Sequence, residues 1–192
     1  MTVAVIAGAP GAGKGTQASA LANRLGGRHV STGDLFRDHL VRDTQLGRRA
    51  RSYLDAGRYV PDDVTNGMLR DAVTQQDAAV PLVLDGYPRT EAQVGFLDTL
   101  LAESGRQAPA VVALVVDTEE LVRRLGRRAL LENRSDDTEN VIRKRQAVYL
   151  AQTAPILRIY RQRGSLREID GTGAVEEVAD RIDNALSALC TG

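Results

Sequence analysis

The chain has 192 residues, of which 43% are hydrophobic, so it is long enough for one well-cored α/β domain. Its 25 basic and 25 acidic residues cancel, whereas a nucleic-acid-binding protein normally carries a basic excess, so that class of protein is disfavoured. The single cysteine, Cys190, rules out a disulfide or a multi-cysteine zinc site within one chain, and no apolar run approaches the ~20 residues of a membrane span. Because the chain begins without a charged-then-apolar leader, we expect a cytoplasmic protein.

Short β-type runs alternate with helical patterns along the chain. The runs are Val3–Ala7, His29–Ser31, Leu82–Asp85, Val111–Val116 and Leu166–Ile169. This alternation predicts a parallel sheet of about five strands, with crossover helices on both faces. In such sheets ligands bind beyond the carboxyl ends of the strands, so the residues after each run are the candidates for function.

The first run leads into a glycine-rich turn and then into a helical pattern, with the sequence Gly8-Ala9-Pro10-Gly11-Ala12-Gly13-Lys14-Gly15-Thr16-Gln17. Glycines let successive backbone N–H groups point at one anion, the helix N-terminus adds a positive dipole end, and Lys14 adds a full charge. We interpret the segment as a phosphate-binding loop. The strict pattern places Ser or Thr directly after the lysine to hold the metal ion, but Gly15 occupies that position and Thr16 follows it.

With that departure the loop resembles the adenylate kinase family of nucleoside monophosphate kinases. The resemblance implies a P-loop NTPase-type fold in a single kinase domain, residues 1–192. It also implies an ATP site that includes Gly11, Ala12, Gly13, Lys14, Gly15 and Thr16.

The second run ends in Ser31-Thr32-Gly33-Asp34-Leu35-Phe36-Arg37. Ser31 or Thr32 can cap the following helix, and taken alone a capped surface helix with a solvated arginine explains the segment equally well. We interpret His29, within the run, as structural. The segment is also similar to a motif of the same family, which implies that Thr32 and Arg37 hold the acceptor nucleotide and that Arg37 binds its phosphate bidentately.

Residues 32–60 look like a small helical excursion from the core, as the acceptor-binding part of that family is. Pro61, followed by two acidic residues, is typical of the start of a new helix. The resemblance implies that the backbone around Arg58, Tyr59 and Val60 meets the acceptor base.

The third run ends in Asp85-Gly86-Tyr87-Pro88-Arg89-Thr90, and Gln93 follows one helical turn later. A carboxylate at the end of a strand beside the phosphate loop can organise magnesium, directly or through its waters, although a turn or cap aspartate is the simpler alternative. The segment closely resembles the adenylate kinase pattern, which implies acceptor contacts from Gly86, Tyr87, Pro88, Arg89 and Gln93. Kinases for UMP and CMP tend to differ at the Thr32 and Gln93 positions, so these two residues favour AMP.

The helix pattern after the fourth run is strongly basic, with Arg123, Arg124, Arg127 and Arg128. A charge run of this kind is usually a solvated helix face. More arginines follow soon after it, however, and so many of them around one short connector in a neutral protein favour an anionic ligand such as two nucleotides.

The segment resembles the family's lid, here residues 123–137, in its short form without a zinc-bearing hairpin. The resemblance implies that Arg123 stacks on the ATP adenine and that Arg127 and Arg134 contact the phosphates. It further implies that Arg145 reaches both substrates, with contacts from Arg134 and Arg145 to AMP. Gly173, in the glycine turn after the fifth run, corresponds to a residue beside the ATP adenine.

The resemblance covers essentially the whole chain and implies a monomeric, magnesium-dependent kinase that converts ATP and AMP into two ADP. It implies no nucleic-acid partner and no structural zinc. The implied catalytic residues, which work by position and charge, are Lys14, Arg89, Arg127, Arg134 and Arg145. Two alternatives stay open: a UMP/CMP kinase, and a switch that binds ATP without turning over AMP.

Overall fold

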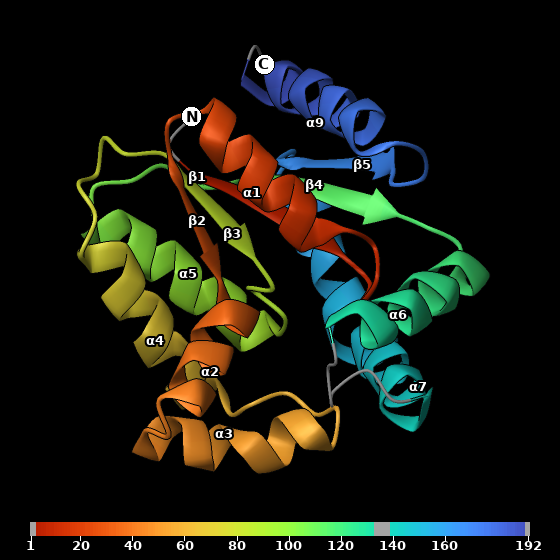
Figure 1. Ribbon diagram of the computed structural model, residues 1–192. Coiled ribbons are helices and arrows are strands. Elements are labelled where there is room, and N and C mark those ends of the chain that lie inside the picture. The colour runs from red at the N-terminus through yellow and green to blue at the C-terminus, as the bar shows by residue number, and fades with distance from the viewer. Residues whose placement is uncertain (1–2, 133–138, 191–192) are drawn as a thin grey trace.

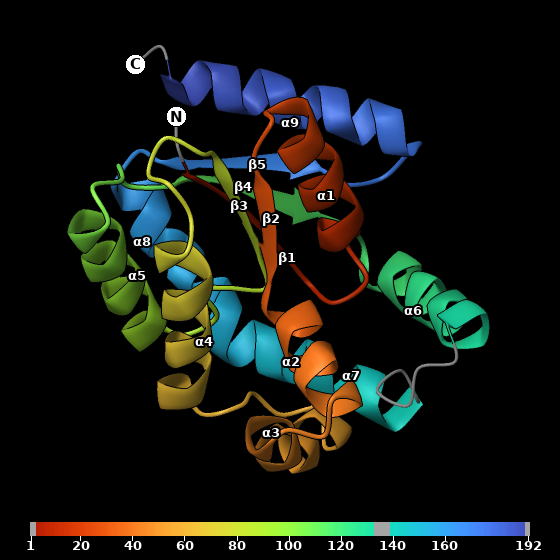
Figure 2. The same ribbon diagram turned by 60° about the vertical axis from the view of Figure 1, so that its left-hand side comes forward.

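The computed structural model describes residues 3–132 and 139–190, with side chains described for residues 3–129 and 140–189. Five parallel strands form one sheet in the order β2-β3-β1-β4-β5 (Figures 1 and 2). Each strand begins and ends within one residue of its predicted run, so the predicted parallel α/β sheet is confirmed. The bounds are β1 Val3–Gly8, β2 Arg28–Ser31, β3 Leu82–Asp85, β4 Ala110–Val115 and β5 Leu166–Asp170.

Helices fill the connections between the strands. None of the described helices is long and apolar enough to cross a membrane. Between α7 and α8 the chain forms a π-helical turn, η2, and a 3-10 turn, η3. The bounds are α1 Lys14–Arg24, α2 Thr32–Val41, α3 Gln45–Asp55, α4 Asp62–Thr74, α5 Glu91–Glu103, α6 Thr118–Glu132, α7 Glu139–Val148, η2 Tyr149–Thr153, η3 Ala154–Ile156, α8 Leu157–Gln162 and α9 Val175–Cys190.

The apolar core lies on both faces of the sheet because successive strand residues point to opposite sides. In β1, Val3 and Val5 belong to one buried cluster, and Ala4 and Ile6 belong to the other. Residues of α4, α5 and α8 cover the first face, and residues of α1 and α9 cover the second (Figure 2). The sheet is therefore buried on both sides, and its carboxyl edge is left for ligands.

Helices α2 and α3 extend away from the sheet (Figure 1), and residues 32–60, which contain them, are here called the excursion. The excursion has a small apolar core of its own, made of Phe36, Ala50, Val60, Val64 and Met68. Ser31 caps α2, because its Oγ accepts a hydrogen bond of 3.3 Å from the backbone N–H of Asp34. Thr32, the other candidate cap, is the first residue of the helix, and its hydroxyl donates a hydrogen bond to Gly86 O instead.

Arg106 is a buried arginine that the sequence patterns do not single out. Its side chain is 6% exposed and its guanidinium donates to four carbonyl oxygens between α4 and β3. Two of these bonds are short, at 2.6 Å to Asp77 and 2.8 Å to Val80. The others reach Ala78 and Gln76 at 3.2 and 3.4 Å. One charged side chain thus fixes the connection that leads into β3.

Replacing Arg106 with methionine is expected to lower the free energy of unfolding by about 2 kcal/mol, because four part-buried carbonyls lose a charged donor. Arg161→Met is the matched control, since Arg161 forms only an exposed ion pair of 2.6 Å with Glu168 and such pairs contribute about 0–1 kcal/mol. Urea unfolding of both variants measures the difference. Equal losses in the two variants would show that the Arg106 bonds do not support the fold.

Candidate active site

The phosphate loop, the end of β3 and the basic helices meet in a cleft of about 630 Å³ at the carboxyl edge of the sheet, here called the central cleft. Segments far apart in the sequence contribute to it, since α2 and α7 also reach its walls. The central cleft collects most of the residues predicted for phosphate chemistry, namely Gly11, Gly13, Lys14, Gly15, Thr16, Arg37, Asp85, Gly86, Arg89, Arg127 and Arg145.

The loop between β1 and α1 depends on its glycines. Gly11 and Gly13 have φ values of 90° and 91°, in the left-handed region. A Cβ on Gly11 would lie 2.9 Å from both Leu121 O and Leu125 Cγ, so the loop also packs tightly against α6. Helix α1 starts at Lys14 with no side-chain cap, which leaves its first N–H groups for an anion in the central cleft.

Lys14 is electrostatically unusual. Its Nζ donates a hydrogen bond of 2.9 Å to Ala9 O within the loop. Burial lowers the pKa of Lys14 to about 8, because the charge of Asp85 only partly offsets the lost solvation and nearby arginines oppose another cation. A polyanion placed beside Lys14 would reverse this shift.

Asp85 ends β3 opposite the phosphate loop. Burial alone would raise its pKa, but the neighbouring His29 imidazole and the charges of Lys14 and Arg89 outweigh that effect and lower it. The distance from His29 Nε2 to Asp85 Oδ2 is 3.9 Å. His29, interpreted above as structural, therefore contacts a predicted metal-binding carboxylate.

The carboxylate of Asp85 fits a magnesium ion that arrives with a nucleotide. Magnesium is usually held by one or two carboxylates, waters and substrate phosphates rather than by a complete protein cage. No group of three His, Cys, Asp or Glu side chains gathers as a metal site among the described residues. Asp85 and Thr16 line the same cleft as the phosphate loop.

A second cavity of about 280 Å³, here called the acceptor pocket, opens between the excursion and the turn after β3. Phe36, Leu40 and Leu54 give it apolar walls that suit a flat base. Arg58 lies over the ring of Tyr53, with its Cζ 5.1 Å from the ring centroid. The predicted acceptor residues that line the pocket are Thr32, Arg37, Arg58, Tyr59, Val60, Arg89, Gln93 and Arg145.

The turn after β3 holds Arg89 and Thr32 around one carbonyl. Gly86 O accepts from Arg89 Nε at 2.6 Å and from Thr32 Oγ1 at 2.9 Å. Gly86 has a φ of 75°, and a Cβ there would lie 2.7 Å from Arg89 Nη2 and 2.8 Å from Thr32 Oγ1. The turn therefore favours glycine for its left-handed backbone, and a Cβ there would displace the Arg89 and Thr32 side chains from these positions.

Gln93 is 2% exposed and its amide is oriented by neighbours. Its Oε1 accepts from the backbone N–H of Arg89 at 2.7 Å, and its Nε2 donates to Asp62 Oδ1 at 2.6 Å. Thr90 Oγ1 donates to the other oxygen of Asp62 at 2.8 Å. Because an ionised carboxylate only accepts, Asp62 fixes which end of the amide is the nitrogen. One N–H and one lone pair of Gln93 remain for a ligand.

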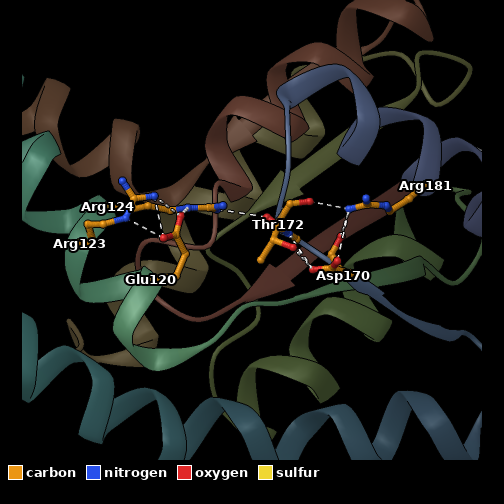
Figure 3. A network of polar contacts seen from close by, with 7 residues as sticks. Glu120, Arg123, Arg124, Asp170, Thr172 and Arg181 are labelled. Atoms are coloured by element: carbon orange, nitrogen blue, oxygen red, sulfur yellow. Dashed lines mark hydrogen bonds and ion pairs between the residues drawn. The ribbon is translucent and has the colours of Figure 1, made fainter.

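A third cavity of about 320 Å³, here called the donor pocket, lies between the phosphate loop and the segments after β4 and β5. Glu120 organises its rim by accepting 2.8 Å bonds from Arg123 and a 2.6 Å bond from Arg124 (Figure 3). These bonds lower the pKa of Glu120. On the far side, Asp170 accepts from Thr172, and Arg181 donates to Thr172 O at 2.6 Å (Figure 3). Predicted ATP residues in this pocket are Ala12, Gly13, Thr16, Arg123, Arg127 and Gly173.

Some predicted residues are not brought to these cavities. The Tyr87 side chain is 2% exposed, and its hydroxyl donates to Asn66 Oδ1 at 2.6 Å, so it belongs to the core. Tyr87 and Pro88 do not line the acceptor pocket, but they line a smaller adjoining cavity together with Lys14 and Arg89. Arg134 lies outside the described residues. Helix α6 continues through Glu132, so Arg127 lies inside a helix and much of the predicted lid is helical.

Known proteins resemble this chain over nearly its full length. A family model described as "Adenylate kinase" matches residues 6–165. A protein from Nocardioides sp. named "Adenylate kinase" is 51% identical over 185 residues, which cover 96% of this chain and 97% of the relative. Proteins with the same name from Clavibacter michiganensis and Thermobifida fusca are each 49% identical, covering 97% and 96% of this chain and 94% and 97% of the relatives.

Proposed function

The chain belongs to the adenylate kinase family and is a nucleoside monophosphate kinase that transfers a phosphoryl group between ATP and AMP, and on that premise we propose which residues carry the reaction. The proposal rests on one observation: the central cleft joins the phosphate loop, Asp85 and several guanidinium groups between two separate pockets. Two nucleotides that meet there bring their phosphates together among fixed positive charges.

The acceptor pocket is proposed to hold AMP. The free lone pair and N–H of the Gln93 amide match the amino group and a ring nitrogen of adenine, as amides do elsewhere with this base. Arg37, Arg89 and Arg145 line both this pocket and the central cleft, so they can bind the AMP phosphate at the boundary. Arg37 forms an ion pair with Asp34, and both side chains are exposed.

The donor pocket is proposed to hold the base of ATP. Glu120 holds the Arg123 guanidinium by two hydrogen bonds, which pre-orients its plane for stacking on adenine. Gly173 lies across the same pocket, where its backbone can contact the base edge. Arg127 lines both the donor pocket and the central cleft and is proposed to bind the ATP phosphates.

Catalysis is proposed to come from position and charge. The AMP phosphate is itself the attacking nucleophile, so no side chain needs to form a covalent intermediate. Lys14, Arg89, Arg127 and Arg145 surround the transferred group, and Arg134 is added by family resemblance. Magnesium bound with ATP supplies charge neutralisation on the phosphate oxygens, and Asp85 would hold it, directly or through waters.

We carry three further expectations over from the family as proposals. The acceptor excursion, residues 32–60, and the lid, residues 123–137, close over both substrates and exclude water. The protein acts as a monomer, which light scattering during size-exclusion chromatography would test. The expected location is the cytoplasm.

An ADP-release assay with Mg-ATP and AMP, CMP, UMP or GMP in turn tests the function. Strong turnover with AMP alone supports the roles of Thr32 and Gln93. Preference for a pyrimidine nucleotide would overturn the acceptor assignment while keeping the chemistry. Binding of ATP without turnover of any acceptor would instead favour the non-catalytic switch.

Nucleotide binding is expected to take up protons in alkaline solution, because Lys14 has a pKa of about 8 in the free protein and its ammonium is stabilised by phosphate. Below pH 7 Lys14 is already charged and uptake from this source is absent. It grows as the pH rises through 8, where the free protein begins to lose the proton that the complex retains. Calorimetric titration with ATP in two buffers of different ionisation enthalpy measures this uptake.

Lys14→Arg is the control for proton uptake, since a guanidinium keeps its proton throughout this range. The variant should bind ATP without the alkaline uptake. Equal uptake by both proteins at pH 9, or none by the unmodified protein, would contradict the assignment to Lys14.

A further inference from the structure

Tyr59 makes two side-chain contacts that a purely backbone role at this position does not require. Arg89 lies over its ring, with the guanidinium Cζ 5.0 Å from the ring centroid. Its hydroxyl oxygen lies 2.7 Å from Thr153 Oγ1. Tyr59 belongs to the turn between α3 and α4, where the excursion returns to the core, and it is half-buried.

The hydroxyl contacts form a directed chain that ends on Arg89. Thr153 Oγ1 donates to Arg89 O at 3.0 Å, which uses its only proton. Thr153 must therefore accept from Tyr59, so the hydrogen bonds run from the Tyr59 hydroxyl through Thr153 to Arg89 O. Thr153 is 6% exposed, which protects this pair of bonds from solvent.

Thr153 ends the π-helical turn η2. Such turns occur mostly as short interruptions of α-helices and are frequent at functional sites. Three segments meet at Arg89, which itself belongs to the turn after β3. Thr153 brings η2 to it, and Tyr59 brings the end of the excursion. These three segments are distant in the sequence, since Tyr59 and Thr153 are separated by 94 positions.

Arg89 is fixed on every side except its tip. Its backbone N–H donates to Gln93, its carbonyl accepts from Thr153, its Nε donates to Gly86 O, and the Tyr59 ring supports the guanidinium plane. Among residues 3–129 and 140–189, whose side chains are described, its two Nη atoms donate no hydrogen bond. Arg89 lines both the acceptor pocket and the central cleft.

We propose that the Tyr59 side chain is a positioning residue for AMP phosphate binding, because its ring and hydroxyl hold Arg89 in place before the substrate arrives. This inference rests on the proposed role of Arg89. A long arginine loses much rotamer freedom when it binds an anion, and a prearranged guanidinium avoids that loss at the binding step. The effect acts on the acceptor phosphate and not on ATP binding in the donor pocket.

Three variants distinguish the effect of the Tyr59 ring on Arg89 from a general loss of packing. They are Tyr59→Leu, Tyr59→Phe and Phe96→Leu. Phe96, on α5, is the matched control. The Arg70 guanidinium lies over its ring, with Cζ 5.2 Å from the ring centroid, and Phe96 lines none of the three cavities. We expect Tyr59→Leu to lower kcat/KM for AMP about 5- to 30-fold, the range for a cation–π contact of this kind, with KM for ATP unchanged. Tyr59→Phe keeps the ring, so its kcat/KM for AMP should fall less. Phe96→Leu should leave kcat/KM for AMP unchanged.

Thr153→Val tests the hydroxyl chain in a variant of nearly the same shape. It should also weaken kcat/KM for AMP alone, and the double variant with Tyr59→Phe should lose less than the product of the two single losses, because both remove one connected chain. Independent losses would overturn the hydroxyl chain. Equal changes for ATP and AMP in Tyr59→Leu, or a Tyr59→Leu protein that behaves like Phe96→Leu, would overturn the positioning role.

The unmodified protein distinguishes failure of this inference from failure of the proposed function. If it turns over AMP normally while the Tyr59 variants behave as the control does, only the positioning role is lost. If it turns over no AMP, the proposed function itself fails and the role of Tyr59 fails with it.

Discussion

Arg89→Ala is expected to lower kcat about 10³-fold in a protein that remains folded. Arg89 is the guanidinium that reaches both the acceptor pocket and the central cleft from the turn after β3, so it can contact the AMP phosphate and the transferred group. Loss of one fixed donor to developing charge typically costs 10²–10³-fold, and removal of a phosphate-binding arginine about 10³-fold or more. Steady-state ADP release under saturating substrates measures the loss.

Arg161→Ala is the control for this substitution, because its ion pair with Glu168 lies on an exposed surface. Its kcat for ADP release should equal that of the unmodified protein. Thermal unfolding of both variants checks that the fold is intact. Near-normal turnover by a correctly folded Arg89→Ala protein would remove Arg89 from the catalytic residues.

Gly86→Ala is expected to lower kcat/KM about 10²-fold through a single added carbon. The new Cβ would lie 2.7 Å from Arg89 Nη2 and 2.8 Å from Thr32 Oγ1, so both side chains must move. A displacement of about 1 Å in a positioned group is enough for a loss of that size. The same ADP-release assay, with AMP varied, measures it.

Gly164→Ala is the control that distinguishes the steric effect of the new Cβ in Gly86→Ala from the backbone strain that both substitutions cause. Gly164 has a φ of 72°, close to the 75° of Gly86, but a Cβ there meets nothing within 4 Å. Both variants should lose similar stability, about 1–2 kcal/mol from the left-handed backbone, and only Gly86→Ala should lose activity. Similar kcat/KM values for the two would show that the turn after β3 tolerates the added carbon.

The sequence predicts the sheet and the phosphate loop well, because both depend on local patterns. The apolar runs place all five strands within one residue, and the glycine spacing before Lys14 locates the loop. Ser31, a predicted cap, is confirmed as the N-cap of α2. These features need only neighbouring residues to be recognised.

The supporting contacts of the site could not be predicted in the same way. Asp62 orients Gln93 across 31 positions, and Thr153 holds Arg89 across 64 positions. Their partners are set by how the helices pack on the sheet, and no local pattern carries that information.

The strand order has a consequence for how this enzyme can change. The acceptor pocket is built mainly by the chain that follows β2 and β3, and the donor pocket mainly by the chain that follows β4 and β5, with the β1 loop between them. Each half of the sheet can therefore accumulate substitutions with little effect on the other half. Acceptor preference is expected to be open to laboratory evolution by a library confined to residues 32–60 and Gln93, which leaves Asp85 and Arg89 in place, while ATP use is inherited unchanged from the opposite half.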